Sequence, residues 1–587
     1  MNKYLKKAIF FSTISLTLVL LFNYSFYRYQ NVNINYSLIL ILSIIISILS
    51  LYFSNKNVKW IIIIIFLFFL SLRAFDPIST PYNVISYGPD ANYHYQIVRV
   101  IEENQRLIFS EKYYTGAAKG YYGYPMLEFL LIILNKMTGL NLSTLVKYFG
   151  FTLGLPTLIF VLHYYKSRLK TNKNQSILIL SVLLYASCPW YIGFTAITTH
   201  LSLSFPLFIL TLSMLFNDRT RAGWKKRLVV LLLLLSTILT HHFMGLMLIV
   251  FITATIIMRH IVHKHFVVDE KKKLTYCSLL FVSIAVFSWL LKIPYISTSI
   301  LFLFTEIGKY IFLKPWGFTR ALEIFATPVV EKPIWMIIIQ IIGYISFLGL
   351  GLLGLIWTFL EKTFTKNQFV DQRVHIDTIG LLLTAAILAL PYLIGFELFY
   401  DLMWRSLLFI YLALAPLVAK SLIIINNYVI KVKFFKLLGR FLIIAVLACI
   451  IQNAIYSGIY YHHYDNSAEM QPEDTRLNLV QWISLADYTK KYINSDIMYG
   501  VRLANNLVGS LGKKNIIQIA GINIVPGSQI IRPSDFVIEK GQIFILRKSL
   551  VTVPEQKNYT FSQKELDTIL DRFNIIYQSQ DPFIITR

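Results

Sequence analysis

Long apolar runs separated by short polar segments are the dominant pattern of this chain, and residues 61–70 are one example, written IIIIIFLFFL. A helix that crosses a membrane needs ~20 mostly apolar residues, with ~17 as a lower limit. This rule predicts about thirteen spanning helices, at residues 8–27, 37–53, 60–75, 144–164, 176–191, 200–216, 228–241, 243–258, 275–292, 335–360, 377–395, 403–420 and 441–458. The pattern therefore predicts an all-α polytopic membrane domain.

Two segments decide whether this topology is consistent. Residues 125–140 are apolar but short and contain Glu128 and Lys136, so we expect an interfacial or re-entrant helix on the external side. Residues 228–241 and 243–258 are predicted as two separate helices. Fusing them into one helix would invert every later crossing, and the positions of the basic loops argue against that.

The basic residues gather in alternate loops. The chain has 55 Lys and Arg against 30 Asp and Glu, a formal charge of +25, and a mean hydropathy of +0.60. Basic clusters lie near residues 3–7, 56–59, 166–173, 219–227, 259–273, 362–373 and 420–440, whereas loops 192–199 and 396–402 contain no Lys or Arg. Cationic loops are retained in the cytoplasm, so the N-terminus is predicted cytoplasmic in a multi-pass protein of the cell membrane. The basic excess then reports topology, and no nucleic-acid partner is expected.

The last part of the chain has a different composition. Residues 459–587 are polar and charged, with helical patterns at 475–493 and 562–573 and strand-like runs at 497–501, 516–522, 543–546, 574–577 and 583–586. They predict a soluble extracytoplasmic α/β domain that follows a membrane domain at 1–458. The three cysteines lie far apart in or beside apolar runs and indicate neither a disulfide framework nor a metal motif.

Candidate chemistry is concentrated in the first long external loop, residues 73–143. It contains Ser86-Tyr-Gly-Pro-Asp90-Ala-Asn-Tyr-His94-Tyr, with Arg99 further on. Asp90 follows a Gly-Pro break and begins a predicted helix, so it could serve as a helix N-cap. It could equally take a proton from an acceptor or hold a divalent cation, with His94 and Arg99 as accessory residues.

This motif, followed by Tyr124-Pro125 and an apolar helix, resembles the first external loop of GT-C glycosyltransferases, and of the oligosaccharyltransferase catalytic subunit in particular. The resemblance implies a GT-C-like fold, a sugar donor carried on polyprenyl phosphate or pyrophosphate, and Asp90 as the catalytic or metal-binding acid. It also makes Mg²⁺ or Mn²⁺ a candidate cofactor.

The sequence departs from that family at two places. The next external loop, residues 188–200, contains no acidic residue where the family has a second acidic motif, so the cofactor remains unknown. The Trp-Trp-Asp-Tyr-Gly motif that reads the acceptor sequon is also absent. Peptide N-glycosylation is therefore not inferred.

Other external residues could bind the phosphate of the donor. His241 and His242 lie at a predicted turn between two helices, and Arg405 begins a later helix on the same side. The histidines could instead cap the ends of the helices. Arg405 could instead anchor its helix at the membrane interface or pair with Asp401. Glu323 is a candidate second acid, or the partner of Arg320 in a surface pair.

A cluster of tyrosines in the first external loop has two interpretations. The residues are Tyr113, Tyr114, Tyr121, Tyr122 and Tyr124. Aromatic rings could stack on sugars, or they could form the aromatic belt that many membrane proteins carry at headgroup depth.

These features together predict a membrane glycosyltransferase. It would move a sugar from a polyprenyl-phosphate carrier to a glycan, lipid or protein acceptor on the external face, with Asp90 as acid/base. A surface-polysaccharide polymerase or ligase, relying on external arginine and histidine, also fits the topology. A transporter fits less well, because the predicted spans are nearly free of charge and show no repeat.

Overall fold

The structure is a computed structural model of the chain, and the residues that it describes form helices, their immediate connections and five strands. They are residues 44–46, 58–74, 89–107, 123–169, 175–215, 223–262, 270–292, 334–364, 372–393, 400–431, 436–464, 493–495, 522–524, 543–546, 574–578 and 583–586.

The chain divides into two compact units. The first contains Met1–Ser79, Gly150–Ala196 and His200–Tyr461, and the second contains Thr80–Phe149, Ile197–Thr199 and His462–Arg587. The predicted division into domains at 1–458 and 459–587 remains a prediction.

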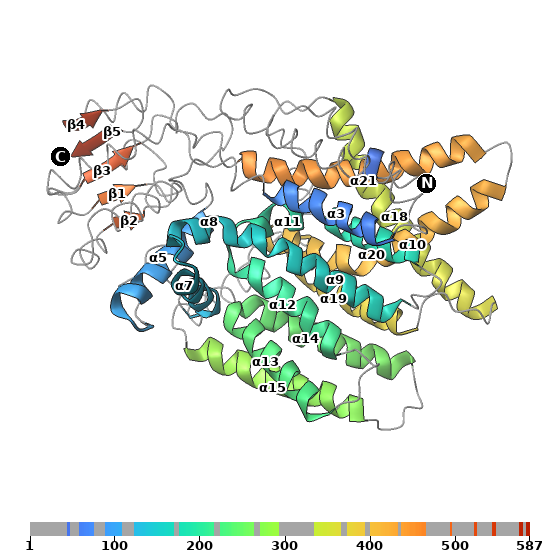
Figure 1. Cartoon of the computed structure of the whole chain (residues 1–587), viewed down its shortest axis with the longest axis horizontal. Coiled ribbons are helices and arrows are strands. Elements are labelled where there is room, and N and C mark those ends of the chain that lie inside the picture. The colour runs from blue at the N-terminus through green and yellow to red at the C-terminus, as the bar shows by residue number, and fades with distance from the viewer. Residues whose placement is uncertain are drawn as a thin grey trace, which may run out of the picture. The chain divides into compact units, whose positions relative to one another are not determined.

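The first unit is helical throughout its described residues (Figure 1). Its helices are α3 (Val58–Arg73), α9 (Gly154–Arg168), α10 (Gln175–Ala186), α11 (Pro189–Ile192), η2 (Phe194–Ala196), α12 (His200–Leu215), α13 (Trp224–Thr240), α14 (His242–Val262), α15 (Glu270–Lys292), α18 (Ile334–Phe364), α19 (Gln372–Leu393) and α20 (Tyr400–Lys431). Two further helices, α8 (Leu142–Thr152) and α21 (Lys436–Tyr464), each include a boundary between the units.

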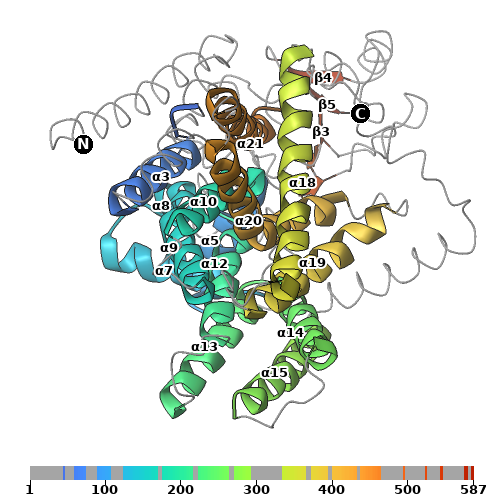
Figure 2. The ribbon, with the colours of Figure 1, turned by 90° about the vertical axis from the view of Figure 1, so that its right-hand side faces the viewer.

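Helix α20 lies at the centre of this helical unit, where it packs against α10, α18 and α19. Figure 2 shows α18 as a long helix, and α18 packs beside α20. Two glycines permit the close approach of α18: a Cβ on Gly354 would lie 2.3 Å from the carbonyl oxygen of Leu417, and one on Gly351 would lie 3.1 Å from Leu414. Small residues that let helix backbones approach are typical of helix contacts in membranes.

Lipid is the expected surrounding of these helices. Among the described residues, Leu142–Ser167, Ile338–Thr358 and Arg405–Tyr428 are long and apolar enough to cross a membrane. One side of α18 exposes a stripe of apolar residues at helical spacing, namely Ile338, Ile341, Ile345, Leu348, Leu352 and Ile356. A helix that is apolar on its outer face as well as its inner face is stable in hydrocarbon and costly in water.

Each predicted span from 60–75 onward coincides with a helix or with a run of helices. The total of thirteen remains a prediction, because residues 8–27 lie outside the described residues and only residues 44–46 of the span 37–53 are described, as helix. The predicted end of the span 403–420 is too early. Helix α20 continues to Lys431, since residues 421–428 are still largely apolar, and Lys420 is 1% exposed inside it rather than in a cytoplasmic loop.

The helix predicted at 176–191 is interrupted. Helix α10 ends at Ala186, and α11 begins at Pro189. Proline has no backbone N–H and disfavours helical geometry in the residue before it, so Pro189 suits the first position of α11, and Cys188 before it is extended, with φ −68° and ψ 125°. The interruption leaves two short elements, α11 and η2, between α10 and α12.

The turn between the two short predicted helices is confirmed. His241 has φ −159° and ψ 120°, which is extended backbone, between α13 and α14. The Thr237 and Thr240 hydroxyls donate to the carbonyl oxygens of Leu233 and Ser236, a local hydrogen bond that competes with regular helix. The His241 backbone serves both helices, because its N–H bonds to Thr237 and its carbonyl oxygen accepts from Gly245.

The second unit contains α5 (Pro89–Asn104) and α7 (Met126–Thr138), which pack together, and a five-stranded sheet. Helix α7 has 13 residues and so is ~20 Å long, too short for a hydrocarbon core of ~30 Å. This length agrees with the prediction that residues 125–140 do not cross. Gly139, at φ 70°, ends the helix in the left-handed conformation that glycine adopts readily.

The sheet is formed by β1 (Ile493–Ser495), β2 (Ile522–Ile524), β3 (Ile543–Leu546), β4 (Asn574–Gln578) and β5 (Phe583–Thr586). Its order is β2-β1-β3-β5-β4, with parallel pairs on the β1 side and antiparallel pairs from β3 to β4. The strands predicted at 543–546, 574–577 and 583–586 are confirmed, and the run at 516–522 overlaps β2 only at Ile522.

Some predictions for this tail are not settled. Ile493, the predicted end of a helix, instead begins β1. The strand predicted at 497–501 and the remainder of the two predicted helices lie outside the described residues, so the α/β assignment stays a prediction.

Candidate functional site

Two groups of ionisable side chains carry the candidate chemistry, one in each unit. In the helical unit, His241 and Arg405 lie near Phe243, and His200 lies near His241. In the second unit, His94 lies against Glu128.

His200 and His241 occupy the first turn of α12 and the residue before α14. Both are buried, and their ring centroids are 6.0 Å apart with the planes nearly perpendicular. His241 Nδ1 accepts a hydrogen bond of 3.1 Å from the Phe243 backbone N–H. A neutral imidazole with a lone pair on Nδ1 carries its proton on Nε2, so His241 presents Nε2–H as a donor.

Arg405 lies in the second turn of α20 and reaches the same aromatic residue. Its guanidinium carbon is 5.7 Å from the Phe243 ring centroid, and the ring centroid of His241 is 6.0 Å from that of Phe243. A guanidinium over an aromatic face gains ~0.5–2 kcal/mol and keeps its N–H groups in one plane for bidentate contacts. The helical unit therefore brings together one fixed positive charge and two imidazoles, which is a suitable set for an anion such as phosphate.

A buried arginine supports the segment before His200. Arg73, the last residue of α3, is 1% exposed. Its Nη1 donates to the Tyr191 carbonyl oxygen and to Thr195 Oγ1 at 2.7 Å, and its Nη2 donates to the carbonyl oxygens of Gly150 at 2.7 Å and Thr195 at 2.6 Å. Its guanidinium carbon also lies 4.6 Å from the centroid of the Tyr191 ring. Arg73 thus fixes α11 and η2, which lead into α12.

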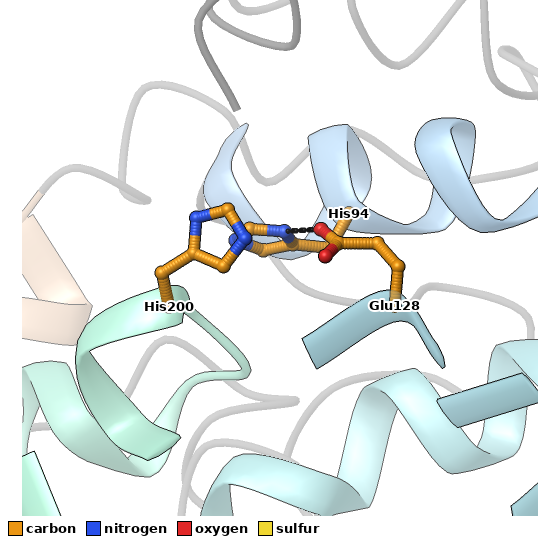
Figure 3. A group of neighbouring side chains, drawn as sticks. All are labelled: His94, Glu128 and His200. Atoms are coloured by element: carbon orange, nitrogen blue, oxygen red, sulfur yellow. Dashed lines mark hydrogen bonds and ion pairs between the residues drawn. The ribbon is translucent and has the colours of Figure 1, made fainter. Parts of the chain in front are cut away.

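In the second unit, His94 and Glu128 form a buried pair. His94 Nδ1 and Glu128 Oε1 are 2.8 Å apart, with the side chains 1% and 0% exposed (Figure 3). The dashed contact in the figure joins α5 to α7. Imidazole nitrogen and carboxylate oxygen are also the donor atoms that hold divalent cations in many proteins, so these two side chains are candidate ligands for such a cation.

The predicted site residues are placed as follows. Asp90 lies in the first turn of α5, which begins one residue earlier at Pro89, and its side chain is outside the described part of the structure. A carboxylate in a first helical turn is favoured by the helix dipole, so the capping alternative stays open. Arg99 is half-buried further along α5, and His242 is the first residue of α14, without a described side chain. Glu323 lies outside the described residues.

The tyrosine cluster is described only at Tyr124. This side chain is buried, and burial raises the pKa of its hydroxyl well above the usual value, so it stays protonated. A ring in that position contacts protein, so Tyr124 neither stacks on a sugar nor belongs to an exposed belt. Tyr113, Tyr114, Tyr121 and Tyr122 lie outside the described residues.

Sequence reasoning missed Glu128, His200 and Arg73 as site residues. Glu128 is an acidic residue in an otherwise apolar helix, and a buried carboxylate requires a partner, which is the signal that could have indicated it. In the sequence, His200 is only the end of a loop without acids, and Arg73 is only the end of a predicted span.

Comparisons with known proteins give matches only among solved structures. No protein-family model and no curated protein matches the chain. ArnT from Cupriavidus metallidurans, bound to undecaprenyl phosphate, is similar over 85% of this chain and 93% of that one, with 10% identity and a TM-score of 0.44. The oligosaccharyltransferase of Archaeoglobus fulgidus is similar over 77% of this chain and 64% of its own, with 11% identity and a TM-score of 0.48.

The second of these structures belongs to the group that the Asp90 motif resembles. Both TM-scores are below 0.5, so these matches give no basis for assigning a function. The function proposed below is inferred from the side chains of this protein.

Proposed function

We propose that the protein is a membrane glycosyltransferase that moves a sugar from a polyprenyl-phosphate or polyprenyl-pyrophosphate carrier to an acceptor on the external face. The observation that carries this proposal is a chain of neighbouring side chains, in which Arg405 and His241 both lie near Phe243 and His200 lies near His241. It lies at the starts of α12, α14 and α20, which the loop charges predict to be external.

This group suits the phosphate of a lipid-linked donor. Transfer breaks the bond between the anomeric carbon and a phosphate oxygen, and negative charge develops on that phosphate as it leaves. Arg405 can offset this charge through bidentate hydrogen bonds, and His241 can donate Nε2–H. The positive end of the helix dipole at the start of α14, a helix of 21 residues, favours an anion at the same place.

Asp90 supplies the complementary function toward the acceptor. Its carboxylate takes the proton of the acceptor hydroxyl while the acceptor oxygen attacks the anomeric carbon from the face opposite the phosphate, so that the configuration inverts. His242, Arg99 and Glu323 are accessory candidates. A divalent cation at Asp90 remains an alternative to direct proton transfer.

The test uses the full-length protein in proteoliposomes with a panel of radiolabelled polyprenyl-phosphate hexoses. Release of sugar to water measures donor cleavage without knowledge of the acceptor. We expect wild-type protein to release sugar from at least one donor, and Asp90→Asn to abolish the release. An Asp90→Asn protein that inserts normally and releases sugar at the wild-type rate contradicts the role of Asp90.

Arg405 is tested with a matched control. A hydrogen bond to a charged group contributes ~1.5–3 kcal/mol, so Arg405→Gln should lower kcat/KM for the donor by about 10- to 150-fold. Lys225→Gln also removes a cation near an aromatic ring, 6.0 Å from Trp224, but on the side predicted to be cytoplasmic, and should leave kcat/KM unchanged.

A polysaccharide polymerase or ligase is the second candidate, favoured by the arginine and histidine content of the same group. The two functions make opposite predictions for one pair of variants. If Arg405→Gln is inactive while Asp90→Asn retains full activity, the polymerase or ligase is supported and the glycosyltransferase mechanism through Asp90 is rejected.

A further inference from the structure

Helix α7 has an exposed apolar face. Phe129, Ile133 and Met137 follow one another at intervals of four residues, so they lie on one side of the helix, and they are 40%, 52% and 78% exposed. The buried residues Glu128 and Leu131 lie on the opposite side. A helix that buries one face and exposes an apolar face opposite it is unfavourable in water. The exposed face is therefore expected to have an apolar partner.

The end of α7 is close to the start of a membrane span. Residues 142–167 are long and apolar enough to cross a membrane, and only residues 139–141 separate them from Thr138, the last residue of α7. A chain extends by at most ~3.6 Å per residue, so the four steps from Thr138 to Leu142 cover no more than about 14 Å. The end of α7 is therefore within that distance of the residue at which the span begins.

Hydrogen bonds fix the turn between α7 and α8. Gly139 has φ 70°, and its N–H donates to the carbonyl oxygen of Asn135. The Asn135 side chain donates to the Leu140 carbonyl oxygen at 2.8 Å. Asn141 Oδ1 accepts hydrogen bonds of 3.1 Å from both the N–H and the hydroxyl of Ser143, in the first turn of α8. This turn sets the direction of α7 relative to the start of the span.

Helix α5 keeps α7 from entering the hydrocarbon end-on. His94 Nδ1 lies 2.8 Å from Glu128 Oε1, and eight residues further along each helix Lys136 Nζ lies 4.0 Å from Glu102 Oε1. The two helices therefore run side by side in the same direction. Beyond Glu102, α5 ends in polar residues, and exposed Arg106 follows it. Moving these charges into hydrocarbon is costly, so only the side of α7 that faces away from α5 can meet lipid.

We propose that α7 is a membrane-docking helix, which lies along the bilayer surface with Phe129, Ile133 and Met137 among the acyl chains just below the headgroups. Interfacial helices bury their apolar face by ~5–10 Å in this way. The leaflet is the one in which the adjoining span begins, which the loop charges predict to be external. The partner is lipid, because the fixed turn holds this face next to the start of a span. Docking also holds α5, which carries Asp90 in its first turn, at the membrane surface.

Depth-dependent fluorescence quenching tests the docking in the full-length protein, without reference to glycosyl transfer. Cys277 and Cys449 are replaced by serine, whereas Cys188 is fully buried and remains. A single cysteine, introduced as Ile133→Cys, carries a nitrobenzoxadiazole label in phosphatidylcholine vesicles. The quenchers are a lipid with a nitroxide near its headgroup, a lipid with a nitroxide near the end of its acyl chain, and iodide in the water.

At position 133, we expect the shallow nitroxide to quench at least about twice as strongly as the deep one, because an interfacial helix stays near the headgroups. Iodide should have little effect. A label at Leu348→Cys, which is 47% exposed at the middle of the span Ile338–Thr358, should show the reverse order of the two nitroxides. A label at Arg106→Cys should be quenched by iodide.

Three results at position 133 would overturn the docking. Stronger quenching by the deep nitroxide means that α7 is re-entrant. Quenching by iodide alone means that the face is open to water. Quenching by none of the three means that another part of the protein, or a second copy, covers the face.

A pair of variants tests whether the apolar face itself causes the docking. Asparagine at both Ile133 and Met137 removes apolar contact with lipid, and should lower shallow quenching of a label at Phe129→Cys by at least about twofold. Lys136→Gln changes an exposed residue whose side chain reaches toward Glu102 of α5, and should leave the quenching unchanged. Unchanged quenching in the asparagine variant, or an equal loss in Lys136→Gln, refutes docking through this face.

Discussion

The close approach of Gly154 to Arg73 gives a quantitative test of the helical unit. A Cβ added to Gly154 would lie 2.4 Å from Arg73 Nε and 2.7 Å from its Cδ. These atoms are in the middle of a side chain whose guanidinium is held by four hydrogen bonds, so the arginine cannot move aside without breaking them. Gly154→Ala should therefore destabilise the protein by ~1–3 kcal/mol, the usual cost of overpacking.

Removing the arginine should have a larger effect on its own. Arg73→Met leaves the carbonyl oxygens of Gly150, Tyr191 and Thr195 without this donor in a buried site, and each buried group left unsatisfied costs ~1–3 kcal/mol. The two changes should not add. Methionine is flexible and has no fixed guanidinium, so Gly154→Ala should cost much less in the Arg73→Met background.

The assay is a double-variant cycle of unfolding free energies, from SDS titration of the purified protein. Gly349→Ala is the control, because a Cβ there meets no atom within 4 Å, and alanine is favoured over glycine inside a helix by ~1 kcal/mol. Additive effects of Gly154→Ala and Arg73→Met, or a neutral Gly154→Ala, would refute the contact between Gly154 and the arginine.

Three further predictions concern stability and binding. Gly354→Ala should destabilise the contact between α18 and α20 by more than Gly351→Ala does. The Cβ at position 354 would meet the rigid backbone of Leu417 at 2.3 Å, whereas the Cβ at position 351 would meet a leucine side chain. SDS titration of both variants checks this order. Thr358→Val removes the hydroxyl that accepts a 3.0 Å hydrogen bond from the buried ammonium of Lys420, and should lower the unfolding free energy by ~1–3 kcal/mol, whereas Thr358→Ser should retain most of it. His200→Phe keeps an aromatic ring beside His241 but removes both nitrogens, so it should leave the melting temperature nearly unchanged. It should raise KM for the proposed lipid-phosphate donor by about tenfold, which corresponds to the loss of ~1.4 kcal/mol of binding. An unchanged KM would exclude His200 from the proposed phosphate site.

The positions of the helices could be predicted from sequence because each depends on its own residues. A run of ~20 apolar residues is stable across lipid only as a helix, which satisfies its backbone hydrogen bonds internally. The turn at His241 could be predicted for a local reason too, since cationic loops on both sides required two crossings. The errors in the predicted helix bounds also have local causes. The apolar run at 176–191 is interrupted before Pro189, and α20 continues past Lys420, which had been assigned to a cytoplasmic loop.

The candidate site could be predicted only in part. Arg405 and His241 could be found because an ionisable residue at the end of an apolar helix is conspicuous in any membrane protein. Nothing in the sequence indicated that both would lie against Phe243, or that His200 would join them, because these residues come from three different parts of the chain. Their proximity depends on how α12, α14 and α20 pack.

The apolar runs were sufficient to predict which segments form helices, and the Gly-Pro break marked Asp90 as the acidic residue of a motif in a loop predicted to be external. Only the tertiary structure paired His94 with Glu128, 34 residues later, and enclosed Arg73 among carbonyl oxygens from 77 to 122 residues away. The physical reason is the range of the interactions. Transfer of a helix into lipid is a sum over neighbouring residues, whereas the partner of a buried charge is decided by which faces of distant helices meet.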